Sequence, residues 1–258
     1  MANGPYWDEG LMLGAGDFPD IVCIGDSWFW YPLNNLLIPI WGLWAGNKTV
    51  FAQGKVGAEA EELAKGKYLS NFRRILKGYP GIKAVLISAG GNDFAGDDDL
   101  SKILNPKNVC QNATTGAGCF DPGKLDQLMF GTVLDAYRVL LREVATYRGE
   151  ALVYLHNYDY AIPTGLGFLG FGRWLKYPMD QAGVPSAVQP LAVNYLLDTF
   201  NDVLAQIQSE FADRTLLIDS SGVLAPADWA NELHPSMSGF NKVVTQAWQQ
   251  PLMDNLPP

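Results

Sequence analysis

Three groups of residues in this chain could together perform nucleophilic catalysis. Ser27 follows Gly25 and Asp26 directly after an apolar run at 21–24, which predicts a buried strand that ends in a tight turn. Open α/β sheets place reactive groups at the carboxyl ends of their strands. A serine hydroxyl needs a neighbouring base before it can attack a carbonyl carbon at neutral pH. His234 is our candidate for that base.

The chain has only two histidines, so the base is either His234 or His156. His234 precedes Pro235 in a loop after the last predicted strand. His156 closes the fourth predicted strand, where we expect it to support the fold or to line the pocket. The spacing of cysteines and histidines offers no metal site, and we expect neither a metal nor a cofactor.

Two further positions could stabilise the negative charge that develops on the carbonyl oxygen. Asn92 lies in the sequence GGND after the third predicted strand, and its side-chain NH₂ is a hydrogen-bond donor. Gly57 precedes a stretch rich in Ala and Glu, which favours a helix. We expect the Asn92 side chain and the backbone N–H groups of Gly57 and Ser27 to converge on one oxygen, as in an oxyanion hole.

Together these groups resemble the sequence blocks of the SGNH, or GDSL-type, hydrolase superfamily. The blocks of that family are a GDS serine, a glycine after the second strand, a GxND asparagine and a DxxHP histidine. The matching residues occur in the same order here as Ser27, Gly57, Asn92 and His234. The resemblance covers nearly the whole chain. It implies a serine esterase that hydrolyses carboxylic esters through an acyl-enzyme and needs no cofactor.

The chain departs from the family three residues before the histidine, where Asn231 replaces an aspartate. In serine proteases, replacing the aspartate that orients the histidine by asparagine lowers kcat by about 10⁴. Asp228, six residues before His234, could supply the missing charge if the loop folds back. Both Asp228 and Asn231 are therefore candidates for orienting His234, and the charge argument slightly favours Asp228.

The elements that must position these residues alternate along the chain. Apolar runs predict five strands, at 21–24, 49–52, 84–88, 151–156 and 215–219. Apolar residues at helical spacing predict long helices over 125–147 and 192–211. This alternation predicts an α/β fold with a parallel sheet. The resemblance implies a single domain over 1–258, a flavodoxin-like three-layer α/β/α sandwich with strand order 2-1-3-4-5.

Two irregular insertions follow predicted strands, at about 97–123 and 161–185. Because they follow carboxyl ends of strands, we expect both near the active-site edge. The second is rich in Gly, Pro and aromatic residues, which favours a lipophilic acyl or aryl ester as substrate. Residues expected to bind such a substrate are Trp28, Phe168, Phe171 and Trp174. The alternatives are a carbohydrate or peptidoglycan O-deacetylase and a non-catalytic binding protein on the same scaffold.

The composition excludes some partners. The net charge of −9 argues against binding to nucleic acid through a basic surface. The longest apolar region, at 28–45, contains Pro32 and Pro39 and is too broken for a transmembrane helix. The first residues lack the basic start and apolar core of a signal peptide. We therefore expect a small-molecule or lipid-like ester as the partner, and the sequence does not define the oligomeric state.

Two of the three cysteines, Cys110 and Cys119, bracket a polar loop. The sequence is compatible with a local disulfide and equally with two free thiols. A disulfide would imply an oxidising compartment, and so a secreted or periplasmic protein. Without it, the compartment is unknown.

Overall fold

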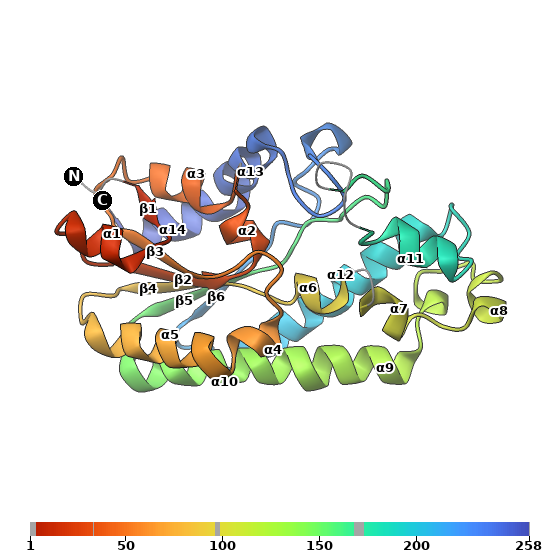
Figure 1. Ribbon diagram of the computed structural model, residues 1–258, viewed down its shortest axis with the longest axis horizontal. Coiled ribbons are helices and arrows are strands. Elements are labelled where there is room, and N and C mark those ends of the chain that lie inside the picture. The colour runs from red at the N-terminus through yellow and green to blue at the C-terminus, as the bar shows by residue number, and fades with distance from the viewer. Residues whose placement is uncertain (1–3, 33, 96–98, 168–172, 258) are drawn as a thin grey trace.

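The computed structural model describes residues 4–32, 34–95, 99–167 and 173–257. A parallel sheet runs through the molecule, with helices on both of its faces (Figure 1). Its strands, in the spatial order β1-β3-β2-β4-β5-β6, are β1 (Pro5–Tyr6), β3 (Val50–Gly54), β2 (Ile21–Gly25), β4 (Ala84–Ser88), β5 (Leu152–His156) and β6 (Thr215–Ile218). The α/β class is therefore confirmed.

The sheet has six strands where the sequence predicted five. The predicted strands are β2 to β6, and their spatial order is the expected 2-1-3-4-5. The additional strand, β1, pairs with β3 through Pro5 and Tyr6 alone. Two residues carry no measurable alternation of apolar and polar side chains, so a pattern search could not detect this strand.

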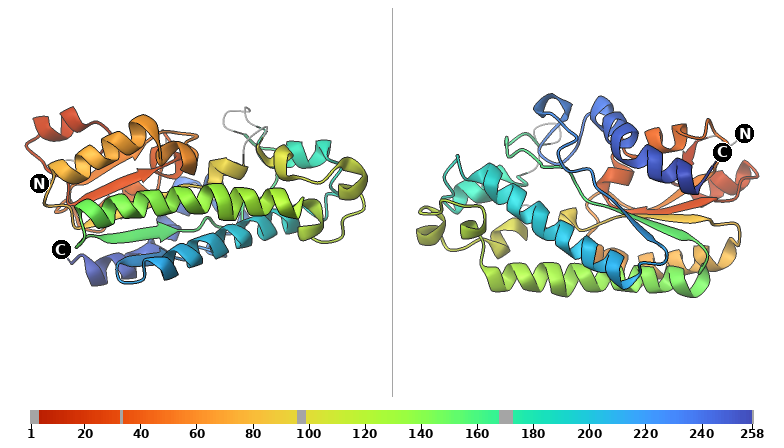
Figure 2. Two further views of the ribbon diagram at one scale, coloured as in Figure 1. Left: turned by 90° about the horizontal axis from the view of Figure 1, so that it is seen from below. Right: turned by 180° about the vertical axis from the view of Figure 1, so that it is seen from behind.

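The central strands explain why the sheet forms where it does. Every residue of β2 and β4 is buried, which is typical of parallel strands covered by helices on both faces. On one face, α10 packs against α5 and α12 (Figures 1 and 2). Helices α3, α13 and α14 lie on the other face. The predicted helix over 125–147 is a continuous run of α9, a π-helical segment and α10.

The helices vary widely in length, from three residues to 22. Their bounds are α1 (Glu9–Gly14), α2 (Ser27–Trp30), α3 (Leu37–Gly42), α4 (Ala60–Leu63), α5 (Gly66–Gly78), α6 (Gly91–Phe94), α7 (Asp99–Ile103), α8 (Lys107–Cys110), η1 (Ala117–Cys119), α9 (Pro122–Asp126), η2 (Gln127–Val133), α10 (Leu134–Tyr147), α11 (Lys176–Gln181), α12 (Gln189–Glu210), η3 (Pro226–Asp228), α13 (Met237–Val243), η4 (Val244–Trp248) and α14 (Gln249–Asn255).

Glycines allow the backbone to pack closely at the edge where the strands end. Gly54 has a φ of +128°, and a Cβ atom there would lie 1.9 Å from the carbonyl oxygen of Gly25. Gly90 has a φ of +104°, and a Cβ atom there would lie 2.5 Å from the ring of Phe200. Only glycine tolerates both the positive φ and the contact at these positions. These close approaches lie beside the turns that carry Ser27 and Asn92.

Helices of both insertions lie beyond the carboxyl ends of the strands (Figure 1). In the first insertion, Cys110 and Cys119 are buried and are not bonded to each other. The thiol of Cys110 instead contacts the carbonyl oxygen of Asn105 at 3.1 Å. The structure therefore gives no support to the disulfide alternative. Within the described residues, no helix is long and apolar enough to cross a membrane.

Candidate active site

The structure brings Ser27 and His234 into contact, although 207 residues separate them in the sequence. Ser27 is the first residue of α2, and its Oγ lies 2.7 Å from Nε2 of His234. Asp26 caps this helix by accepting a hydrogen bond from the backbone N–H of Trp28 at 3.0 Å. The serine turn is therefore fixed by its own local sequence, as the pattern at 25–27 predicted.

Asn231 fixes the tautomer of His234. Its Oδ1 accepts hydrogen bonds from the backbone N–H groups of Leu233 (3.0 Å) and His234 (2.9 Å), and it lies 3.0 Å from Nδ1 of His234. A carbonyl oxygen can only accept, so Nδ1 must carry the proton in this contact. Nε2 is then unprotonated, and it can accept the proton of Ser27.

The structure corrects the preference for Asp228 as the partner of His234. The Asp228 carboxylate accepts hydrogen bonds from the backbone N–H of Ala225 at 2.8 Å and from Nζ of Lys242 at 2.9 Å. The short loop from Ala230 to His234 is closed by hydrogen bonds from the backbone N–H groups of Ala230 and Asn231 to the carbonyl oxygen of His234. This loop places Asn231 at Nδ1, and Asp228 instead closes a neighbouring turn.

Two aromatic rings hold the imidazole of His234. Tyr31 stacks on it with ring centroids 4.1 Å apart, and Trp174 presents its ring at 77° with centroids 5.7 Å apart. The hydroxyl of Tyr31 also accepts a hydrogen bond from Nδ2 of Asn231 at 3.1 Å. Burial lowers the pKa of His234 to about 4. The ring is therefore neutral near pH 7, which is the state that a general base requires.

The second histidine lies in a different environment. His156 is fully buried among the rings of Trp28, Phe29, Tyr158 and Trp248. Its Nδ1 is 2.8 Å from the carbonyl oxygen of Asn157, and its Nε2 has no hydrogen-bond partner among the described residues. These contacts are those of a packed core residue, as expected from the sequence.

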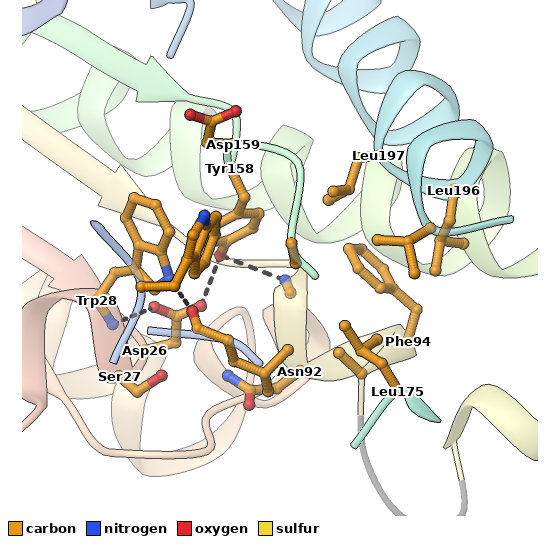
Figure 3. Close-up of a pocket in the computed structure, with 16 residues that line it drawn as sticks. Asp26, Ser27, Trp28, Asn92, Phe94, Tyr158, Asp159, Leu175, Leu196 and Leu197 are labelled. Carbon is orange, nitrogen blue, oxygen red and sulfur yellow. Dashed lines mark hydrogen bonds between the residues drawn. The ribbon is translucent and has the colours of Figure 1, made fainter. Parts of the chain in front are cut away.

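Two of the three candidate oxyanion donors lie at the same pocket. Asn92 and Ser27 both line it (Figure 3). The side-chain NH₂ of Asn92 donates one hydrogen bond to the carbonyl oxygen of Ala58 at 3.1 Å, which leaves its second N–H for a ligand. Gly57 precedes Ala58 in the turn after β3. Asn92 is thereby tied to the turn that carries Gly57.

A network that the sequence did not reveal joins the serine turn to the asparagine turn. The hydroxyl of Tyr158 donates to Oδ2 of Asp26 at 2.6 Å and accepts from the backbone N–H of Gly91 at 3.3 Å (Figure 3). Ser88 donates to Oδ1 of Asp26 at 2.9 Å. Burial raises the pKa of Asp26 to about 6, although the hydrogen bond from Tyr158 opposes this rise.

The structure describes two of the four residues that we expected to bind the substrate, Trp28 and Trp174. Trp28 lines the pocket, and its indole N–H donates to the carbonyl oxygen of Leu233 at 3.0 Å. Trp174 lies against His234. Phe168 and Phe171 lie outside the described residues.

The pocket is mainly apolar. Its far wall is formed by α6, α12 and the residue that precedes α11, through Phe94, Leu196, Leu197 and Leu175 (Figure 3). Its free volume is about 40 Å³. Ser27 and Asn92 are the polar groups at its near end, with Asp26 and Tyr158 behind them.

Several solved lipases and esterases share the fold of this chain. An aryl esterase of M. smegmatis, in its inhibitor-bound form, is 12% identical at a TM-score of 0.56, over 92% of this chain and 100% of that chain. An extracellular lipase from Streptomyces rimosus is 15% identical at a TM-score of 0.53, over 89% and 99% of the two chains. A lipase from a goat rumen metagenome is 14% identical at a TM-score of 0.57, over 92% and 97%.

The sequence itself matches no family model and no curated protein. At 12–15% identity, the likeness to these structures establishes the fold alone. This fold is the one that the resemblance of the sequence blocks implied.

Proposed function

We propose that this protein is a serine esterase that hydrolyses carboxylic esters through an acyl-enzyme. The observation that carries the proposal is the 2.7 Å contact between Ser27 Oγ and His234 Nε2, with Nδ1 held by Asn231. A hydroxyl activated by an oriented imidazole is the minimal arrangement for acyl transfer. The esterases and lipases that share the fold support the same reaction class.

In this proposal, Ser27 Oγ attacks the carbonyl carbon of the ester while Nε2 of His234 takes the hydroxyl proton. The carbonyl oxygen becomes an oxyanion, which accepts hydrogen bonds from the Asn92 side chain and the backbone N–H groups of Gly57 and Ser27. The C–O bond to the alcohol then breaks, and His234 returns the proton to the leaving oxygen. Water, activated by the same nitrogen, releases the acid and restores Ser27.

Asn231 makes this catalytic arrangement weaker than one with an aspartate. Its Oδ1 fixes the direction of the imidazole, but a neutral amide stabilises the positive charge that His234 acquires in the transition state less than a carboxylate does. The charge must be offset by the hydrogen bond and by the stacked ring of Tyr31. We therefore expect a functional enzyme whose kcat rises when the charge is restored.

Three variants of the His234 loop test this assignment. Asn231→Asp should raise kcat by about tenfold or more, because a carboxylate stabilises the imidazolium. Asn231→Ala should lower kcat by about 10² or more, because the tautomer is no longer fixed. Asp228→Asn should leave kcat nearly unchanged. It should lower the melting temperature by about 2–4 °C for each kcal/mol of stability that is lost with the hydrogen bonds of the Asp228 carboxylate. The measurements are kcat and melting temperature, and a large loss of kcat in Asp228→Asn would restore Asp228 as the orienting residue.

The apolar wall of the pocket favours an ester with a short lipophilic acyl chain. A water molecule needs about 10–15 Å³ of such volume, so a free volume of about 40 Å³ accommodates an acyl chain of a few carbons. A carbohydrate O-deacetylase needs only an acetyl group at this place and gains nothing from the leucine side chains of α12. The contact of Ser27 with an oriented histidine favours catalysis over a purely binding role.

Acyl-chain length tests this substrate class. We expect kcat/KM for p-nitrophenyl butyrate to exceed that for the acetate by about tenfold, because each additional buried methylene contributes about 0.8 kcal/mol. The decanoate should show no further gain, because its chain exceeds the pocket. A preference for acetate would favour the deacetylase alternative, and a folded protein without activity on all three esters would favour the binding protein.

A further inference from the structure

Glu232 is a buried carboxylate that the proposed reaction does not use. It lies between Asn231 and His234 in the sequence, and it is 1% exposed. Its partners are backbone groups of the second insertion. Oε1 accepts hydrogen bonds from the N–H groups of Gly165 at 2.8 Å and Lys176 at 3.0 Å, and Oε2 accepts one from Leu175 at 3.1 Å.

These contacts connect two separate parts of the insertion, at Gly165 and at 175–176, to the loop of the candidate base. The backbone N–H of Glu232 also donates to the carbonyl oxygen of Leu166 at 3.0 Å. Lys176 begins α11 and Leu175 precedes it, so the carboxylate satisfies N–H groups that a helix leaves without partners at its start. Hydrogen bonds to an ionised acceptor are stronger than those between neutral groups, and a buried carboxylate is costly unless it is fully paired. The hydrogen bonds to Glu232 therefore strongly favour the observed position of Gly165, Leu175 and Lys176.

The residues that Glu232 holds contact the candidate site directly. Trp174, which precedes Leu175, packs its ring against His234. Leu175 and Leu233 both line the apolar pocket. The backbone N–H of Leu175 donates to Glu232, and Leu233 follows Glu232 in the sequence. One carboxylate thus joins a part of the pocket wall to the loop that carries the base.

We infer that Glu232 is a positioning residue that sets the selectivity for the acyl chain by fixing Leu175 in the pocket wall and Trp174 against His234. This inference rests on the proposed esterase function. When the clamp formed by Glu232, Gly165, Leu175 and Lys176 is lost, the wall beside the acyl chain loses its fixed position. A longer acyl chain touches that wall, whereas acetate does not reach it.

The experiment compares Glu232→Gln with a matched control, Asp121→Asn. Glutamine has nearly the same shape, but its NH₂ group faces backbone N–H donors where the carboxylate accepted. Asp121 also caps a helix, since it accepts from the N–H of Lys124 at 3.1 Å at the start of α9, but it belongs to the other insertion. In Glu232→Gln, the ratio of kcat/KM for butyrate to that for acetate should fall by about fivefold or more, because the contribution of the additional methylenes depends on a fixed wall. The control should keep the wild-type ratio.

Hydrogen exchange provides a readout that does not depend on activity. The amides of Gly165, Leu175 and Lys176 should exchange faster in Glu232→Gln than in the wild-type protein, and those of the control should not change. Leu175→Ala, which leaves the clamp intact, should reduce the butyrate-to-acetate ratio in the same direction. It tests the pocket wall even if Glu232→Gln does not fold.

The outcomes separate the inference from the proposed function. Equal losses on acetate and butyrate in Glu232→Gln, or an unchanged ratio in Leu175→Ala, would overturn the inference while the esterase function stands. A wild-type protein without esterase activity would overturn the proposed function and with it the selectivity. Unchanged exchange of the three amides in Glu232→Gln would show that Glu232 does not hold Gly165, Leu175 and Lys176 in place, and would overturn the inference.

Discussion

Ser27→Ala is expected to lower kcat/KM for p-nitrophenyl butyrate by about 10⁴ or more, because no other group can form the acyl-enzyme. The loss should not come from unfolding. The Oγ of Ser27 contacts His234, while α2 is capped by Asp26 and its rings pack in the core. The melting temperature of the variant should therefore stay close to that of the wild-type protein.

Ser236→Ala is the matched control for this variant. Ser236 lies two residues after His234, and its Oγ accepts a hydrogen bond from the backbone N–H of Gly239 at 3.1 Å at the start of α13. Its loss should cost about 1 kcal/mol of stability as a missing helix cap, with kcat/KM nearly unchanged. A folded Ser27→Ala protein with unchanged activity would contradict the mechanism.

His234→Ala is expected to lower kcat by about 10³ or more, because the proton of Ser27 then has no acceptor. His156→Ala should act differently. It removes a ring from a packed aromatic cluster, so its main effect should be a lower melting temperature from the cavity that it leaves. Measuring kcat and melting temperature for both variants completes the comparison, because the chain has only two histidines. An inactive His156→Ala together with an active His234→Ala would show that the base had been assigned to the wrong histidine.

The pH profile provides a second readout for the base. Activity requires neutral His234, and burial lowers its pKa to about 4. The kcat/KM should therefore stay constant as the pH falls through 6.5, the usual pKa of histidine, and decline only near pH 4 as the ring becomes protonated. Burial also lowers the pKa of His156 to about 4, so the profile alone does not distinguish the two rings and must be combined with the variants.

The sequence predicted the parts of this site that depend on local pattern. Ser27 follows a buried strand, as the apolar run at 21–24 predicted. The α/β alternation came from apolar periodicity. The order of the five main strands could only be inferred through resemblance to a family, because periodicity does not determine which strands are neighbours.

The remaining features depend on contacts between residues far apart in the chain. Tyr31 and Asn231 are hydrogen-bonded across 200 residues, and Tyr158 and Asp26 across 132. No spacing rule predicts such pairs. Charge alone favoured Asp228 over Asn231, but the backbone hydrogen bonds of the loop decide which side chain reaches Nδ1. The role of Glu232 could not be predicted because its partners are backbone amides, which carry no sequence signal.

Covalent labelling of the nucleophile tests the central claim most directly. Wild-type protein treated with a fluorophosphonate should gain the mass of one phosphonyl group, because the phosphorus mimics the attacked carbonyl carbon, and peptide mapping should locate that group on Ser27. His234→Ala should react far more slowly, because the serine hydroxyl then lacks its base. A wild-type protein that remains unlabelled, or that is labelled at another residue, would contradict the account.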